Sequence, residues 1–296
     1  MNKPFPHFLI VGAPKCGTTA LHNYLTQHPE VNMSPKEIHY FGKDLNYKVK
    51  RPSLEKYNSY FKETGINGDA SVWYFYSDSI YQELKKLGVS PKIIVLLRNP
   101  VEVAYSLHSQ NIIDANENIL NFEEALDLEE SRKLGHNLPP NVDPPRTVYY
   151  KETADFYPRM KVLQENIPAE NIFVGLQEDL KKNTKGFIRE IEVFLGINHF
   201  NNYNFKPVNV NKTVKNKSVN QLIKKPSRFK KSLFRVLIPF KYIRSWLVHK
   251  VYDSNLEYNK RAQLSEKTQT ELKSYFKSYS IKLMDIIKAD ISHWIK

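Results

Sequence analysis

FLIVGAPKCGTTALHNYL, residues 8–25, combines three patterns that together indicate an α/β fold. The first four residues are apolar and end at Gly12, as expected of a buried strand. From Thr18 onward, apolar residues recur at helical spacing until Pro29 ends the helix. A strand, a glycine loop and a helix in this order form an anion site, because the first amides of the helix point at the ligand.

The loop differs in one position from that of nucleotide triphosphatases, G-x-x-x-x-G-K-[ST]. Gly12 and Gly17 keep the spacing, but Thr18 stands where the lysine is expected and Lys15 lies inside the loop. In addition, no apolar strand ends in an obvious magnesium-holding aspartate, and phosphoryl transfer from ATP depends on that metal. The loop therefore favours a less charged reacting group such as sulfuryl, and a P-loop small-molecule kinase is the alternative.

A second anion site is predicted at KIIVLLRNP, residues 92–100. The run is apolar on both faces, which is typical of a central parallel strand, and Pro100 suits the first turn of a helix. Arg98 at the strand end can bind a phosphate with two parallel hydrogen bonds, and Ser106 on the helix can add a hydroxyl. A ligand with phosphates at both ends of a ribose would fit both sites.

Further strands and helices alternate along the chain, which predicts a three-layer, P-loop-like α/β fold with a central, mostly parallel sheet flanked by helices. We expect a single domain over residues 1–296. Residues 111–146 carry an acidic helix and two proline pairs, and we interpret them as a lid or substrate loop. The remaining expected elements are strands at 66–71 and 171–176, and helices at 77–87, 122–134, 184–197 and after Ser265.

The formal net charge of +13 and pI of about 9.4 indicate a polyanionic ligand, an acidic acceptor, an anionic membrane or simply a lysine-rich surface. No nucleic-acid-binding motif is present, so we expect no nucleic acid partner. Cys16 is the one cysteine, which fits a reducing compartment. A strand that begins by Phe8 leaves no room for a signal peptide, and no run of about 18 apolar residues occurs. These features predict a cytoplasmic protein.

Both anion motifs resemble those of PAPS-dependent sulfotransferases. Residues 12–19 resemble the loop that binds the 5′-phosphosulfate, and residues 98–106 resemble the motif that binds the 3′-phosphate. SPKEIHYF, residues 34–41, and the closing residues 258–296 are similar to the heparan-sulfate-type and related bacterial enzymes. The resemblance implies in-line transfer of a sulfuryl group from PAPS to a hydroxyl or amine, on a carbohydrate or lipid-linked acceptor. Adenosine 3′,5′-bisphosphate is then the second product, and no metal is required.

The resemblance also implies catalytic roles. Glu37 aligns with the general base, which takes the proton that the acceptor loses during attack. His39 is the rival base, and alternation along an extended strand would place both side chains on one side. Lys15 would stabilise the charge that develops on the leaving group. Lys36 would contact the sulfate or pair with Glu37, with a solvated lysine as the alternative.

The binding residues that the resemblance implies fall into two groups. NVNKTVKNKS, residues 209–218, resembles a loop that closes over the cofactor, although an arginine is usual near Lys217. Cys16 lies in the cofactor loop, where we interpret it as a small filler rather than a catalytic thiol. The predicted cofactor-binding residues are Lys15, Cys16, Gly17, Thr18, Thr19, Arg98, Ser106, Lys212, Lys217 and Ser218, and the predicted acceptor contacts are Lys36, Asp69, Ser71 and Tyr74.

Residues 201–250 are expected to contain the cofactor-closing loop and a basic helical insertion. The part from 224 to 250 mixes basic and bulky apolar residues, so it either lies on an anionic membrane or packs on the domain. The cysteine pair and anchor of the secretory heparan-sulfate enzymes are not in this sequence, which favours a bacterial cytosolic enzyme. A non-catalytic protein that binds anionic glycans or membrane is a third reading, and neither the acceptor nor the oligomeric state follows from the sequence.

Overall fold

The computed structural model describes residues 4–48, 50–206, 213–224, 237–238, 240–257 and 262–296. These residues pack as two compact units. The first unit comprises residues 1–103, 154–209 and 270–296, and the second comprises residues 104–153 and 210–269. The lid or substrate loop predicted at 111–146 lies entirely in the second unit.

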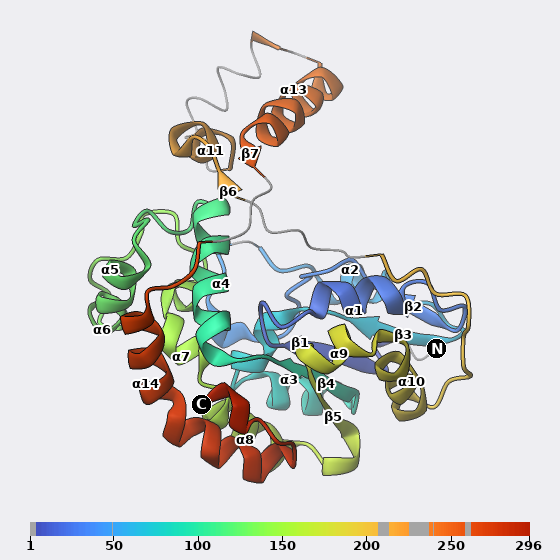
Figure 1. Ribbon diagram of the computed structural model, residues 1–296. Helices are drawn as coiled ribbons and strands as arrows, with labels where there is room; N and C mark the ends of the chain where they lie inside the picture. Colours follow the sequence, from blue (N-terminus) through green and yellow to red (C-terminus); the bar gives the residue numbers. More distant parts are fainter. Residues whose placement is uncertain (1–3, 49, 207–212, 225–236, 239, 258–261) are drawn as a thin grey trace. The chain divides into compact units, whose positions relative to one another are not determined.

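A five-stranded sheet forms the centre of the first unit, with the strand order β2-β3-β1-β4-β5 and parallel pairing throughout (Figure 1). Every residue of β1 is buried, as are the last five residues of β4, which explains why both strands read as continuous apolar runs. The strands are β1 Phe8–Gly12, β2 Val31–Met33, β3 Ile66–Asp69, β4 Lys92–Leu97 and β5 Ile172–Leu176. The predicted three-layer α/β fold is confirmed.

Helices cover both faces of this sheet (Figure 1). One face carries α1, α9 and α10, and the other carries α3 and α8, as expected for right-handed crossovers that run in opposite directions from β1 and from β3. Their bounds are α1 Thr18–Leu25, α3 Ile80–Leu87, α8 Tyr157–Asn166, α9 Gln177–Lys182 and α10 Thr184–Leu195. A short helix, α2 (Leu54–Asn58), precedes β3.

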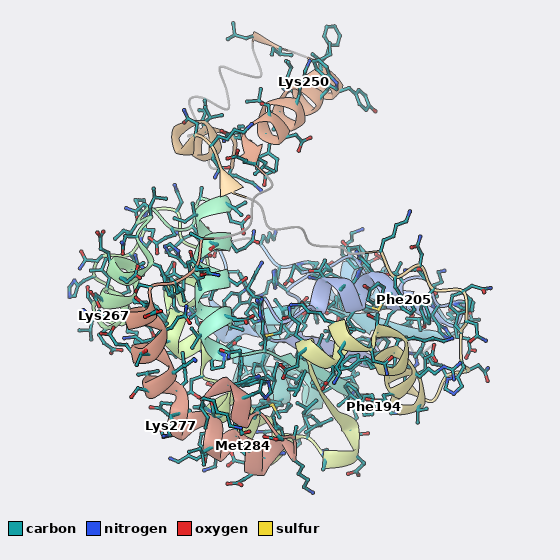
Figure 2. All side chains as sticks on the ribbon, viewed as in Figure 1. Phe194, Phe205, Lys250, Lys267, Lys277 and Met284 are labelled. Atoms are coloured by element: carbon teal, nitrogen blue, oxygen red, sulfur yellow. The ribbon has the colours of Figure 1, made fainter. Side chains whose placement is uncertain are left out.

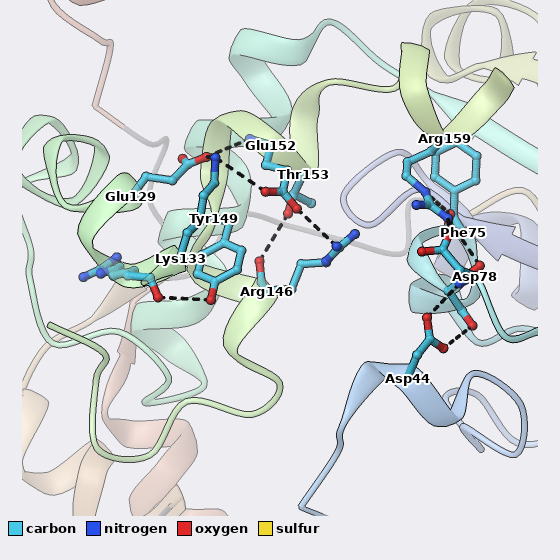
Figure 3. Close-up of polar contacts among 12 residues, drawn as sticks. Asp44, Phe75, Asp78, Glu129, Lys133, Arg146, Tyr149, Glu152, Thr153 and Arg159 are labelled. Carbon is cyan, nitrogen blue, oxygen red and sulfur yellow. Dashed lines mark hydrogen bonds and ion pairs between the residues drawn. The ribbon is translucent and has the colours of Figure 1, made fainter. Parts of the chain in front are cut away.

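An arginine-centred network joins two turns of the first unit (Figure 3). Arg159 on α8 donates to the carbonyl of Phe75 at 3.1 Å and to the carboxylate of Asp78 at 2.7 Å. Asp44, in the 3₁₀ turn η1 (Lys43–Leu45), accepts hydrogen bonds from the backbone of Asp78 at 2.7 Å and from Ser77 at 2.6 Å. The network fixes the segment that follows residues 34–41 against the end of the 3₁₀ helix η2 (Val72–Tyr76).

The second unit is built from helices and one small antiparallel sheet, β6-β7. The predicted helix at 122–134 is in fact two helices, which meet at Leu128. Around them, Lys133 and Arg146 form ion pairs with Glu152 at 3.5 and 3.3 Å (Figure 3). The elements are α5 Phe122–Asp127, α6 Glu129–Lys133, α7 Tyr150–Ala154, α11 Lys217–Lys224, α13 Lys241–Ser254, β6 Thr213–Val214 and β7 Leu256–Glu257.

Two long helices belong to both units, α4 (Pro100–Ile113) and α14 (Glu266–Ile287). Pro100 occupies the first helical position, as predicted. Ser265 caps α14, because its hydroxyl accepts a hydrogen bond from the amide of Thr268 at 3.1 Å.

Candidate functional site

The carboxyl ends of four neighbouring strands bring the predicted site residues of the first unit to one edge of the sheet. The strand order β2-β3-β1-β4 places the segments that follow these strands in a row. They are the segment beginning at Ser34, the segment beginning at Ala70, the loop 13–17 and Arg98. Ligands of open parallel sheets bind at this edge, so the topology supports the predicted location of the site.

Residues 13–17 form the loop between β1 and α1, for which the sequence predicts an anion site, and we call it the anion loop. Gly17 precedes α1 with φ +97°, a conformation that side chains disfavour. Among the described residues, no side chain caps this helix and its first turn carries no acidic residue. A Cβ on Gly12 would lie 2.8 Å from that of Phe75, so the strand end approaches η2 too closely for any other residue.

Arg98 borders this loop. Its Nη1 donates to the carbonyl oxygen of Lys15 at 3.2 Å, and its Nε donates to the carboxylate of Glu102 at 2.7 Å. The guanidinium is therefore held beside the anion loop by an exposed counterion that an anionic ligand can replace. Ser106, the other residue predicted for the second phosphate, is buried on α4 in the second unit.

Lys36, Glu37 and His39 are brought together beside the anion loop. Lys36 Nζ donates to the hydroxyl of Thr19, the second residue of α1, at 2.7 Å and lies 3.5 Å from Glu37 Oε1. His39 Nε2 lies 3.5 Å from Glu37 Oε2. The predicted pairing of Lys36 with Glu37 is thus observed, and its contact with the sulfate stays a prediction.

The expectation that Glu37 and His39 share one side of an extended strand is wrong. Strand β2 ends at Met33, and Glu37 and His39 have φ values of +58° and +53°. Each such left-handed residue costs about 1–3 kcal/mol, which the surrounding contacts must offset. Contact between the two side chains arises from this turn and not from strand alternation.

The environment separates the two candidate bases. Burial raises the pKa of Glu37 and outweighs the nearby charge of Lys36, which lowers it. Burial, together with the charges of Arg51 and Lys36, lowers the pKa of His39 to about 4. A base is most effective when its pKa approaches the working pH, so the shifts favour Glu37 over His39.

Cys16 is fully buried, and its Sγ lies 3.5 Å from the carbonyl oxygen of Pro14. Burial raises the pKa of this thiol to about 12, although the charges of Arg98 and Lys15 act in the opposite direction. The thiol is therefore protonated at neutral pH and is a poor nucleophile. Its burial agrees with the interpretation of Cys16 as a filler of the loop.

Asp69, Ser71 and Tyr74, predicted to contact the acceptor, are at most 1% exposed. Asp69 accepts hydrogen bonds from Ser71 Oγ at 2.9 Å and from Tyr74 Oη at 3.0 Å. It accepts a third from Tyr57, a residue that the sequence did not single out, at 2.9 Å. Burial raises the pKa of Asp69 to about 6 despite these three hydrogen bonds. This arrangement favours a supporting role and not direct contact with the acceptor.

The residues predicted to close over the cofactor are described only in part. Lys212 lies outside the described residues, and Lys217 and Ser218 begin α11 in the second unit. The predicted cofactor-closing loop, residues 209–218, therefore gives way to a helix at Lys217. Within the part of the chain that the structure describes, no group of three or more His, Cys, Asp or Glu residues is arranged to hold a metal ion.

A depression of about 860 Å³ opens at the opposite edge of the first unit, at the amino ends of the strands. His7, Ile66 and Lys92 line it. Because ligands of parallel sheets bind at the carboxyl ends, its position does not coincide with the candidate site.

Comparison with known proteins adds a family to this geometry. The sulfotransferase domain model matches residues 5–276. Mouse heparan sulfate glucosamine 3-O-sulfotransferase 5 is 30% identical over 105 residues, covering 36% of this chain and 30% of that protein. The membrane-associated sulfotransferase kil1 of Dictyostelium discoideum is 26% identical over 295 residues, covering 74% of this chain and 61% of that protein. The chain thus spans about a third and three fifths of the lengths of these two relatives.

The fold has a solved counterpart. The crystal structure of a sulfotransferase from Alicyclobacillus acidocaldarius superposes with a TM-score of 0.72 at 21% sequence identity, covering 99% of this chain and 100% of that one. At this identity the likeness concerns the fold alone.

Proposed function

Because the chain belongs to the sulfotransferase family and is a transferase, we propose that it moves a sulfuryl group from PAPS to a hydroxyl or amine acceptor. The observation that carries this proposal is the short connection from the anion loop to the base. Lys36 binds Thr19 at 2.7 Å and lies 3.5 Å from Glu37, so donor site and base are neighbours. In-line transfer requires this proximity, because the acceptor is deprotonated where it attacks the sulfur.

In the proposed reaction, the acceptor oxygen attacks sulfur while Glu37 takes its proton. The bond between sulfur and the bridging oxygen breaks, and adenosine 3′,5′-bisphosphate leaves with the bond electrons. Lys15 and the first amides of α1 stabilise the charge on this leaving group. We assign no metal to the reaction, as the family resemblance implies.

Recognition of the donor is assigned to two regions. The loop 15–19, including Gly17, Thr18 and Thr19, would hold the 5′-phosphosulfate on backbone amides and hydroxyls. Arg98, which already lies against Lys15, would bind the 3′-phosphate in exchange for Glu102. For Ser106, Lys212, Lys217 and Ser218 the assignment rests on the sequence resemblance.

The acceptor is proposed to be a carbohydrate or a lipid-linked hydroxyl. The relatives whose names mention heparan sulfate act on a glycan, and the present chain shares only part of their length. The kinase alternative is disfavoured by the position of Lys15 and by the family match.

We further propose that the protein is bacterial and cytoplasmic. No helix among the described residues is long and apolar enough to cross a bilayer.

Adenosine 3′,5′-bisphosphate at about 100 times its Kd should raise the Tm by roughly 5 °C, because a ligand of the native state alone adds about 2.7 kcal/mol. Arg98→Ala should abolish most of this shift, whereas Glu102→Gln, which removes only the exposed counterion, should preserve or increase it. Differential scanning fluorimetry measures the Tm of each variant with the bisphosphate, with ATP plus magnesium, and with neither ligand. A shift with ATP–magnesium alone would identify a kinase.

We also propose that the basic segment 224–250 contacts an anionic membrane surface. Its 27 residues include nine Lys or Arg and no Asp or Glu, so it accounts for most of the net charge of +13. On the described part, Phe240, Tyr242 and Trp246 are 67, 89 and 58% exposed. Lys250, which Figure 2 labels on α13, has its ammonium group over the Trp246 ring, 4.9 Å from the ring centroid. Exposed aromatic rings beside lysines suit the headgroup region of a bilayer.

Vesicles containing phosphatidylglycerol should therefore sediment the protein at low salt, and neutral phosphatidylcholine vesicles should not. Tyr242→Ser with Trp246→Ser should weaken this binding by about tenfold or more, because burial of each ring is lost. Val193→Ser, at an equally exposed position on α10, is the control and should leave binding unchanged. Sedimentation with neither kind of vesicle would favour a segment that packs on the protein itself. Equal sedimentation with both kinds would contradict the role of the basic residues.

A further inference from the structure

We propose that Asp69 is a positioning residue that holds the loop carrying the base. Through the hydroxyls of Ser71 and Tyr74, it fixes the backbone of residues 39–41 and thereby the orientation of Glu37. This inference rests on the proposed role of Glu37 and gives the buried carboxylate of β3 a function in the reaction.

The loop has an unusual need for such support. Glu37 and His39 both have positive φ values, and neither residue is glycine. The backbone amides of His39, Tyr40 and Phe41 donate to side-chain hydroxyls and not to a neighbouring strand. An isolated peptide would relax from this conformation, so the acceptors of these amides determine whether it persists.

Two side-chain hydroxyls provide the acceptors. The amide of His39 donates to Ser71 Oγ at 3.2 Å. The amides of Tyr40 and Phe41 both donate to Tyr74 Oη, at 2.8 and 3.2 Å. Three consecutive amides are therefore held by two hydroxyls that come from the segment after β3.

Asp69 orients both of these hydroxyls. Ser71 donates its proton to Oδ1 and Tyr74 donates its proton to Oδ2, so the lone pairs of each hydroxyl face the loop amides. An ionised carboxylate only accepts hydrogen bonds, and charge-assisted bonds of this kind are the stronger ones. The carboxylate thus fixes the direction of every hydrogen bond in the relay.

Glu37 itself is tied to the same segment at both ends. Its amide donates to the carbonyl of Ala70 at 3.0 Å, and its Oε2 accepts from the amide of Val72 at 3.3 Å. Ala70 and Val72 flank Ser71, so the base and the relay share one stretch of backbone. A shift of the 39–41 backbone therefore moves Glu37 relative to Thr19 and Lys36.

Tyr74→Phe tests the relay, with Tyr57→Phe as a matched control. Both variants keep the ring and remove one hydroxyl that donates to Asp69 Oδ2, but only Tyr74 also accepts from loop amides. We expect Tyr74→Phe to lower kcat about 10- to 100-fold, with KM for PAPS and affinity for adenosine 3′,5′-bisphosphate within about twofold. Hydrogen exchange of the Tyr40 and Phe41 amides should accelerate. Tyr57→Phe should keep kcat within about threefold and leave these two amides protected.

A double variant separates positioning from general damage. In a Glu37→Gln background, Tyr74→Phe should add less than about threefold further loss, because both changes act on the same proton transfer. Equal losses of kcat in Tyr74→Phe and Tyr57→Phe, or independent losses in the double variant, would overturn the proposal. Unchanged exchange at Tyr40 and Phe41 would overturn the relay itself. Full transfer by Glu37→Gln would instead refute the assigned base, and the exchange measurement distinguishes these two failures.

Discussion

Glu37→Gln should lower kcat for sulfuryl transfer by about 10²- to 10⁴-fold, the usual contribution of a positioned general base. The amide of glutamine has the shape of the carboxylate and can still accept from Val72, but it cannot take a proton from the acceptor. Affinity for adenosine 3′,5′-bisphosphate should change less than about threefold, because Glu37 lies beside the anion loop and not within it. Steady-state kinetics with PAPS and thermal shifts with the bisphosphate measure the two effects separately.

His39→Asn is the matched control for this variant. It removes the ring that lies 3.5 Å from Glu37, and we expect it to reduce kcat by less than about tenfold. A larger loss in His39→Asn, together with full activity in Glu37→Gln, would transfer the role of base to His39.

The pH dependence of kcat provides a second criterion. Burial raises the pKa of Glu37, so its protonated form persists above the ordinary value of 4.5. Activity should therefore rise with pH as Glu37 loses this proton, and the rise should be missing from the residual activity of Glu37→Gln. His39, with a pKa of about 4, is already neutral in this range and should not contribute to the rise.

The anion loop and Arg98 could be predicted from the sequence because their chemistry is local. Gly12, Gly17 and the first residues of α1 are neighbours in the chain, and a strand that ends at Leu97 necessarily presents Arg98 at the carboxyl edge. The sheet then brings these segments together in the order that parallel crossovers impose. Each step follows from apolar runs and glycine spacing.

The loop of Glu37 and His39 could not be predicted in the same way. The spacing of Glu37 and His39 suggests an extended strand, because residues i and i+2 of a strand share a face. The observed turn depends on acceptors supplied by Ser71 and Tyr74, more than 30 residues away in the sequence. The sequence also predicts Asp69 as a contact of the sulfuryl acceptor, because a polar residue at a strand end is equally consistent with exposure and with a buried relay.

The second unit illustrates how non-local pairing limits a prediction from periodicity. The acidic pattern at 122–134 is helical, yet the helix is interrupted at Leu128, and the side chain of Arg132 is buried. Charged residues are expected on the solvated face of a helix, so nothing in the spacing identifies Arg132 as buried. Its partner Glu117 lies 15 residues earlier, in a stretch without regular structure.

Arg132→Met should destabilise the protein by about 3–5 kcal/mol, the cost of leaving a buried charge without its partner. Arg132 donates to both carboxylate oxygens of Glu117, at 2.7 and 3.0 Å, and both side chains are 0% exposed. Tyr150 adds a third donor at 2.7 Å but no charge. Chemical denaturation of Arg132→Met measures the loss, and Lys161→Met, which removes an exposed pair with Glu165, should cost less than about 1 kcal/mol.

The negative charge on Glu117 explains the loss of stability in Arg132→Met, and the pH dependence of stability tests this explanation. Burial opposes ionisation of Glu117, but the hydrogen bonds from Arg132, from the Ile119 amide and from Tyr150 outweigh it and hold the pKa below 4.5. Ionised Glu117 therefore stabilises the native protein at pH values above its pKa in the unfolded state. This stabilisation is lost as the pH falls through the lower pKa of Glu117 in the native state. Arg132→Met lacks this gain, so the stabilities of the two proteins should differ most near pH 7 and converge in acid. Glu117→Gln with Arg132→Met should recover part of the loss at pH 7, and a loss that is the same at every pH would instead indicate a packing defect.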